Sequence, residues 1–383
     1  MKKIFAFWIK WLARLTPRST PIAAPSTPLA QTIDQAASAP RIPAEPQPTV
    51  APPPVFGRSG EPADFWNAGF RSVLRIKDDS KPPQTKPLPK ATREEVLAEL
   101  ANLEDVPALK SLAENFSRLL GQPNITLEEI VEAISKDSIL CLTILRMANS
   151  VDVALSARVE SVELAVQMLG VVRVRRAAQA HELMRGSESE RTPLDWRPLW
   201  VHSLATAIIA EKLAEVLRLG QPQQLYIAGL LHDVGKVALS SVFPGTYQNI
   251  LLNAWAGDDT LESLEHQGFG VDHCEAGTIF AGKSRMNPLV LQSVAHHGAP
   301  ENASSHRAEV AAVHIANHLA KAYGIGFSGT KFDPQHAPLK SLTAWTVLMA
   351  ETGRRHDVES FCVLMDPFLC ALASDLDVVL KNL

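Results

Sequence analysis

From about residue 91 to the end of the chain, hydrophobic and polar positions follow a helical period. Apolar side chains recur every three or four residues, which is the spacing of one helical face. No strand-like alternation lasts long enough to predict a sheet. We therefore predict an all-α fold. The expected helices cover residues 92–103, 107–120, 126–135, 138–148, 162–169, 171–184, 199–217, 225–231, 247–255, 260–267, 273–282, 288–297, 309–323, 339–351 and 358–382.

The first 16 residues have a different pattern. Lys3, Lys10 and Arg14 share one helical face, and aromatic and aliphatic side chains lie largely opposite. This is typical of an amphipathic helix that lies in a membrane interface, so we expect peripheral membrane contact through residues 1–16. The stretch is too short and too charged to span a bilayer. A secretory signal is a weaker alternative, because Lys10 and Arg14 interrupt the apolar run. A disordered tail or a helix docked on protein is the third interpretation.

Residues 17–92 are predicted to be a Pro-rich disordered linker. Eleven prolines fall between residues 17 and 54, among Ala, Ser, Thr and Gln, and such a composition buries too little apolar surface to fold. Four aromatic residues interrupt it and form either a short docking segment or transient contacts. They are Phe56, Phe65, Trp66 and Phe70.

Beyond the linker we expect a compact helical domain over residues 93–305 and a C-terminal helical extension over 306–383. The net charge of −4 provides no basic field, so no nucleic-acid partner is expected. The four cysteines form no CxxC pair, which favours reduced thiols in a cytoplasmic protein over a disulfide framework or a zinc knuckle.

Candidate chemistry lies in the histidines. The apolar run 225–231 ends in His232 and Asp233, and an imidazole beside a carboxylate suits Zn, Mn or Fe. A single such pair is more often structural, but further histidines recur within or at the ends of apolar helical stretches. We therefore treat a divalent transition metal as the candidate cofactor. The candidate ligands are His202, His232, Asp233, His273, His296 and His297.

Two residues, Asp233 and Lys236, carry the candidate catalytic roles. Cys274, beside His273, is interpreted as buried packing rather than as a ligand.

The order of these histidines resembles the HD superfamily of metal-dependent phosphohydrolases. It resembles one branch more closely, the HDOD domain or HD-related output domain of bacterial signalling proteins. Three further segments resemble those of that branch: 134–138 (ISKDS), 145–150 (LRMANS) and 161–170 (SVELAVQMLG). The resemblance covers roughly residues 105 to 300, about half of the chain.

The resemblance implies a helical HD-like bundle. It also implies a regulatory module that is non-catalytic or weakly catalytic and acts through contacts with signalling proteins. For the site itself, the resemblance implies that Asp233 would hold a metal that activates water for attack on phosphorus, and that Lys236 would bind a phosphate oxygen. Catalytic HD enzymes complete the metal site with an Asp on a later helix, where this chain has Asn317, so the site is expected to be weakened. His314 or His318 is the alternative ligand there.

Other interpretations remain open. One is a metal-dependent phosphohydrolase or phosphodiesterase that acts on nucleotides or cyclic dinucleotides. The HD-GYP type is disfavoured, because no Gly-Tyr-Pro segment follows His297. We expect a cytoplasmic protein, peripheral at the inner membrane if residues 1–16 bind there. The sequence also leaves a homo-oligomer open.

Overall fold

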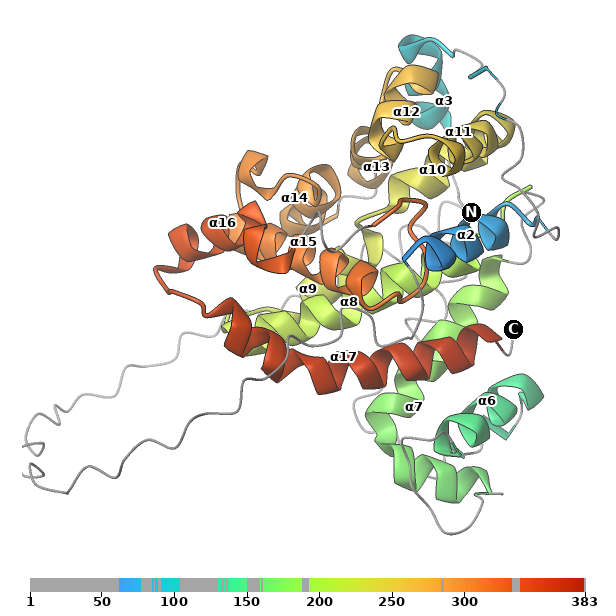
Figure 1. The fold of residues 1–383 in the computed structure, drawn as a ribbon, viewed down its shortest axis with the longest axis vertical. Coiled ribbons are helices and arrows are strands. Elements are labelled where there is room, and N and C mark those ends of the chain that lie inside the picture. The colour runs from blue at the N-terminus through green and yellow to red at the C-terminus, as the bar shows by residue number, and fades with distance from the viewer. Residues whose placement is uncertain are drawn as a thin grey trace, which may run out of the picture. The chain divides into compact units, whose positions relative to one another are not determined.

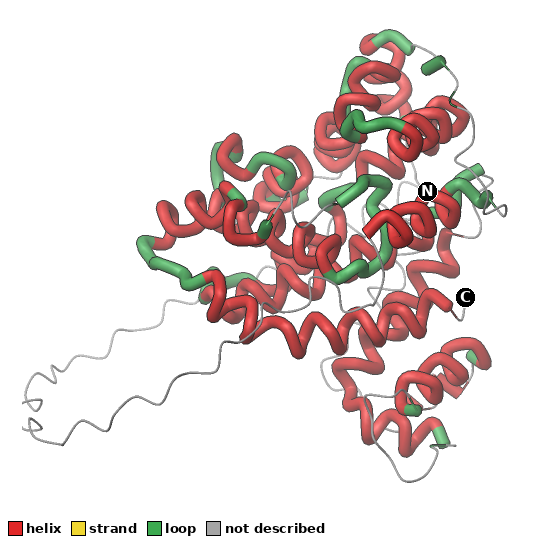
Figure 2. Tube along the Cα trace, viewed as in Figure 1, coloured by secondary structure: helices red, strands yellow, loops and turns green. Residues whose placement is uncertain are grey.

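The computed structural model describes residues 62–76, 91–103, 137–149, 161–187, 193–283, 286–332 and 338–381, with isolated positions between 85 and 159. All of them belong to the compact unit Val55–Leu383. Within these ranges every regular element is helical and there is no strand, which confirms the all-α prediction for this part of the chain (Figures 1 and 2). The helices expected at 1–16 and 107–120 lie outside the described residues, and of 126–135 only residues 130, 131, 134 and 135 are described, all of them helical.

The described helices occur between residues 62 and 381, and they follow one another most closely between residues 197 and 282. They are α2 (Pro62–Val73), α3 (Arg93–Asn102), α6 (Ser138–Ala148), α7 (Val162–Ser187), α8 (Arg197–Leu217), α9 (Pro222–Leu231), α10 (Val234–Val242), α11 (Pro244–Ala256), α12 (Leu261–Phe269), α13 (His273–Gly282), α14 (Pro288–His296), α15 (Arg307–Ala322), α16 (Thr343–Thr352) and α17 (Val358–Lys381), with the 3₁₀ turns Pro300–Asn302 and Leu339–Ser341.

Helix α8 is the central element of the core. It is apolar on nearly all sides, and a helix of that kind is stable only when other elements surround it. Figure 1 shows α8 beside α9, and α8 also packs against α7, α15 and α17. Buried alanines such as Ala205 and Ala207 let these neighbours approach closely. The site described below is built on this close packing.

Helix α10 was not predicted from the sequence. The apolar run was expected to end at Asp233, because Gly235 follows almost at once. The chain instead makes a short turn at His232 and Asp233 and starts a new helix at Val234. Gly235 is required there by packing: a Cβ on this residue would lie 1.8 Å from the carbonyl oxygen of His273 in α13. A glycine that resembles a helix stop is therefore a contact point between two helices.

The predicted linker of residues 17–92 is wrong over α2. This helix is packed, with Phe70 fully buried against Phe327 at a ring-centroid distance of 4.8 Å. Trp255 stacks on the other side of Phe70, and its Nε1–H donates to Asn67 Oδ1 at 2.7 Å. Of the two interpretations of the aromatic residues, the docking segment is the one that the structure bears out for Phe70.

The segments that carry the family resemblance have structural roles. Asp137 caps α6 by accepting from the backbone N–H groups of Ile139 and Leu140, as N-cap residues do. Asn149, after the end of α6, exchanges two 2.8 Å hydrogen bonds with the backbone of Val159. Gly170 bends α7 with a φ of 75°, a conformation that favours glycine. These residues shape the N-terminal helices rather than a reaction site.

The boundary expected at residue 305 does not separate two compact units. Helix α15, which follows it, packs along α8, and residues on both sides of the boundary belong to Val55–Leu383. One described helical stretch, Pro222–Val242, is long and apolar enough to cross a membrane by composition. It comprises α9 and α10, and 83% of its apolar window is buried inside the protein, as in the core of a folded domain.

We expect Asp137 to make the stability of the protein depend on pH. Burial raises the pKa of Asp137, but hydrogen bonds from Leu140 and from His181, whose Nε2 lies 2.9 Å from Oδ2, outweigh it and lower the pKa overall. Asp137→Asn keeps a side chain that can cap the helix and removes the charge. It should reduce the free energy of unfolding at pH 7 by about 1 kcal/mol.

The sign of the effect follows from the lowered pKa. The contribution of the ionised Asp137 is fully present above the unfolded pKa, about 3.9, and is lost as the pH falls through the folded value. Urea unfolding at pH 7, 5, 4 and 3 should therefore show a difference that shrinks below about pH 4. Asp259→Asn, at an exposed position, is the matched control. A difference that does not change with pH would contradict the assignment.

Candidate metal centre

The turn between α9 and α10 places His232 and Asp233 in the interior. His232 is fully buried and Asp233 is 2% exposed. The Nδ1 of His232 lies 2.7 Å from the carbonyl oxygen of Gly229, one turn earlier. Because a carbonyl oxygen can only accept, Nδ1 carries the proton and Nε2 presents a lone pair to the site. Burial lowers the pKa of His232 to about 4, so its ring is neutral.

The two oxygens of Asp233 have different neighbours. Oδ2 accepts from Lys236 Nζ at 2.8 Å and lies 3.3 Å from His232 Nε2. Oδ1 lies 3.5 Å from His273 Nε2 and 3.4 Å from His297 Nε2. Burial raises the pKa of Asp233, but the neighbouring His232 imidazole and the charge of Lys236 outweigh it and hold the pKa well below its usual range. Asp233 is therefore an anion at the centre of a ring of imidazoles.

His202 and Asn317 complete one side of this ring. His202 lies in the second turn of α8, and its Nε2 donates a hydrogen bond to Asn317 Oδ1 on α15 at 3.1 Å. Burial and the neighbouring His232 lower the pKa of His202 well below its usual value. His202, His232 and Asp233 each offer a ligand atom within 4.8 Å of the others. Asn317 stands at the position where the family resemblance led us to expect an Asp, and it thus presents an amide to the site.

His273 is oriented by a buried carboxylate. Its Nδ1 lies 2.6 Å from Glu265 Oε2, and its backbone N–H donates to the same oxygen at 2.9 Å. The hydroxyl of Tyr247 donates to Glu265 Oε1 at 2.8 Å. Burial lowers the pKa of His273, but the charge of Glu265 outweighs it and the pKa is raised well above the usual value. A carboxylate behind an imidazole is the usual support of a histidine that binds metal.

Two polar atoms at the centre have no hydrogen-bond partner among the described residues. They are His232 Nε2 and Asp233 Oδ1, both buried. Imidazole nitrogens lie 3.3–3.5 Å from the oxygens of Asp233, but none of these contacts has the geometry of a hydrogen bond to either of the two atoms. Buried polar groups are nearly always satisfied, so a pair of unsatisfied atoms facing one space points to a site that binds an ion or a water molecule. A lone pair and an anionic oxygen together attract a cation.

Other residues predicted for the site have different roles. Lys236 is buried and donates to Asp233 and to the carbonyl oxygen of Ser328 at 2.9 Å, so it is not free for a phosphate. His296 is half-buried at the end of α14, and the structure gives it no contact with Asp233. His314 donates from Nδ1 to the carbonyl oxygen of His297 at 2.6 Å, and His318 meets the edge of the Phe332 ring. The structure thus offers no support for His314 or His318 as the replacement ligand.

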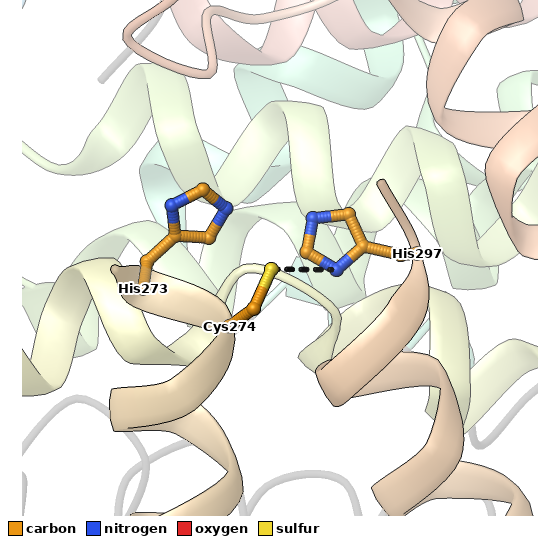
Figure 3. Close-up of side chains that lie close together, drawn as sticks. All are labelled: His273, Cys274 and His297. Atoms are coloured by element: carbon orange, nitrogen blue, oxygen red, sulfur yellow. Dashed lines mark hydrogen bonds between the residues drawn. The ribbon is translucent and has the colours of Figure 1, made fainter. Parts of the chain in front are cut away.

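Cys274 lies closer to the site than the packing interpretation implied. Its sulfur is 4.0 Å from Nδ1 of His297 (Figure 3). Burial raises the pKa of Cys274, but His297 and His273 outweigh it and lower the pKa to about 6. Burial lowers the pKa of His297, yet Cys274 and Asp233 raise it to about 9. The two side chains therefore favour a thiolate beside an imidazolium.

Sequence reasoning missed Glu265. A signal was present, because Leu261, Leu264 and Phe269 define the buried face of α12 and Glu265 occupies that same face. A carboxylate on an otherwise apolar face has to be paired in the interior, and here its partner is the imidazole of His273.

Comparison with known proteins identifies the family to which the chain belongs. The HDOD domain family model matches residues 106–300, just over half of the chain. A crystal structure of an HDOD domain protein with unknown function from Geobacter sulfurreducens has a TM-score of 0.51 and 23% identity, and covers 83% of this chain and 97% of its own. This likeness shows the fold.

Two further matches are more distant. The structure of a candidate phosphohydrolase from Shewanella amazonensis SB2B is 21% identical with a TM-score of 0.45, and covers 73% of this chain and 97% of its own. An uncharacterized protein of Treponema pallidum (strain Nichols) is 24% identical over 222 residues, 56% of this chain and 42% of the relative. The chain thus spans about two fifths of the length of this curated relative. From the match over residues 106–300 and the helical fold around His232 and Asp233, the chain belongs to the HDOD domain family.

Proposed function

We propose that this protein is a non-catalytic HDOD signalling module whose buried centre binds one divalent transition metal, Zn, Mn or Fe, as a structural element. Its output is contact with another signalling protein rather than turnover of a substrate. The two unsatisfied atoms, His232 Nε2 and Asp233 Oδ1, carry the proposal.

The ligand geometry fits such an ion. Metal–nitrogen and metal–oxygen bonds of about 2.0–2.2 Å in a tetrahedral site separate two ligand atoms by roughly 3.4 Å. His232 Nε2 and Asp233 Oδ2 are 3.3 Å apart, and His202 Nε2, which donates a hydrogen bond to Asn317 Oδ1 at 3.1 Å, would bind the metal in the tautomer that carries the proton on Nδ1. His202, His232 and Asp233 would hold the metal, with the Asn317 oxygen as a weaker neutral ligand. A bound cation would satisfy the lone pair and the anion that the protein leaves without partners.

The same geometry disfavours turnover. A hydrolase needs a position open to substrate and water beside the metal. Here His202, His232 and Asp233 are each at most 2% exposed, and Asn317 is 7% exposed. Lys236, the candidate for holding a phosphate, is used to neutralise Asp233. With Asn instead of Asp at position 317, the site also lacks a negative charge that would strengthen metal binding. These three features all favour a closed structural centre.

Exposed apolar side chains support an output through protein contacts. Ile139 and Leu142 on α6 and Leu164 and Val172 on α7 are each more than 40% exposed, and the two helices pack on each other. Exposed apolar groups on adjoining elements are typical of surfaces that bind another protein.

Metal binding should depend on the residue at 317. Asn317→Asp supplies a charged oxygen and should lower the Kd for Mn²⁺ or Zn²⁺ by roughly tenfold or more. Even residues that only hydrogen-bond to a metal ligand change metal affinity by about tenfold or more. Calorimetric titration of the purified protein, stripped with a chelator, measures this. Asn302→Asp adds the same charge at an exposed position and should leave the Kd unchanged. No binding by the natural protein, or equal effects of the two substitutions, would refute the metal centre.

We expect no hydrolysis by the natural sequence. Release of phosphate or linear dinucleotide should be absent with cyclic di-GMP and with nucleoside phosphates, even when Mn²⁺ or Fe²⁺ is supplied. Robust turnover that disappears in Asp233→Ala would overturn the non-catalytic assignment and make the protein a working phosphohydrolase.

The Asp233–Lys236 pair should be a stability element. Asp233→Ala leaves the buried Lys236 charge without its partner, which typically costs about 3–5 kcal/mol. Adding Lys236→Met removes the orphaned charge and should recover part of that loss. Urea unfolding in the presence of a chelator separates this effect from metal binding. Lys212→Met, which breaks an exposed ion pair with Glu215, is the control and should cost at most about 1 kcal/mol. Equal stability of the single and double variants would contradict the pairing.

A further inference from the structure

A second group of ligand-type side chains lies beside the first. His273 and Cys274 open α13, and His297 directly follows α14, so the three come from two helix ends that face each other. Figure 3 shows the sulfur of Cys274 between the two imidazole rings. A ligand atom from each of the three lies within 4.8 Å of the others. None of the three belongs to the His202–His232–Asp233 group.

Each imidazole has an atom available toward this space. Glu265 occupies Nδ1 of His273, which leaves Nε2 for another partner. His297 presents Nε2 to Asp233 and Nδ1 to the sulfur. The other acceptor near that Nδ1, the carbonyl oxygen of Val294, is 3.3 Å away, which is long for an N–H···O bond. His297 therefore lies between the two groups and can serve either one.

The separations suit a tetrahedral metal. Zn–S bonds of about 2.3 Å and Zn–N bonds of about 2.0–2.1 Å place sulfur and nitrogen roughly 3.6 Å apart. The observed distance of 4.0 Å between Cys274 Sγ and His297 Nδ1 requires a shift of less than about 1 Å. Asp233 Oδ1 lies on the far side of the His297 ring, 3.4 Å from Nε2, so it does not share an ion bound at Nδ1, and a water molecule would take the fourth position.

We propose that Cys274 is a thiolate ligand which, with His273 and His297, forms a second metal position that selects Zn²⁺ or Fe²⁺ over Mn²⁺ and Mg²⁺. Soft thiolate sulfur favours the former ions, whereas Mn²⁺ and Mg²⁺ prefer oxygen ligands. The position goes beyond the proposed function, because Cys274, His273 and His297 supply three ligands of their own and share none with the first group. The competing explanation is a weak contact between the thiol and His297 with no metal.

Cobalt substitution distinguishes the two explanations. The full-length protein loaded with Co²⁺ should show a thiolate-to-cobalt charge-transfer band in the near ultraviolet. Cys274→Ser should abolish the band and weaken Zn²⁺ binding at this position by roughly ten- to a hundredfold. Cys362→Ser, which alters a half-buried cysteine on α17, should keep both. Cys274→Asp offers an oxygen ligand of similar reach and should lose the band while shifting the preference toward Mn²⁺, so a folding defect of the serine variant does not hide the result.

Metal content separates this proposal from the earlier one. His232→Ala removes a ligand of the first group alone, so the band should persist in that variant. Cobalt bound without a band, or a band retained in Cys274→Ser, would overturn the role of Cys274 and leave the structural metal centre standing. A natural protein that binds no Co²⁺ or Zn²⁺ at all by elemental analysis would overturn both.

Discussion

The buried charge of Asp233 is the constraint around which the rest of the site is arranged. An isolated carboxylate in a protein interior is strongly unfavourable, so it has to be paired and surrounded by polar groups. Lys236 supplies the opposite charge and also donates to the carbonyl oxygen of Ser328. That contact holds the loop after α15, which is also held by the Phe327 N–H donating to the carbonyl oxygen of Pro198. Phe70 of α2 packs on Phe327, so a chain of contacts runs from the buried charge of Asp233 to the first described helix of the protein.

The imidazoles around Asp233 are positioned before any ligand arrives. Gly229 holds His232 through its carbonyl oxygen, and Glu265 holds His273 through its carboxylate. Each contact leaves the other ring nitrogen directed to the centre, so little conformational entropy is lost when an ion binds. Among the described residues of the centre, His202, His232 and Asp233 are each at most 2% exposed, which supports the proposed structural role.

Much of the site could be predicted from the sequence because its residues lie at the ends of strongly apolar helices. His202, His232, Asp233, His273 and His297 meet in space as their order suggested. The choice between His296 and His297 could not be predicted. Adjacent helical residues point about 100° apart, and the position at which α14 ends decides which one faces the centre.

Other features depend on tertiary contacts that a linear pattern does not contain. Helix α10 was missed because Gly235 resembles a helix stop until its contact with α13 is known. Helix α2 lies in a segment whose proline-rich surroundings predicted a linker, and it packs on the aromatic rings of Trp255 and Phe327, which lie far along the chain. Glu265 was overlooked because its partner, His273, lies on the next helix.

The close approach of Gly235 to His273 has an evolutionary consequence. Because backbone meets backbone there, the spacing between the helices that carry Asp233 and His273 does not depend on a metal or on any one ligand side chain. A lineage can lose a ligand without losing the fold. Codons for Asn and Asp differ by one base, so the amide at position 317 is a single mutational step from a carboxylate. Such a framework can abandon metal chemistry and recover it later, with the same helices in place throughout.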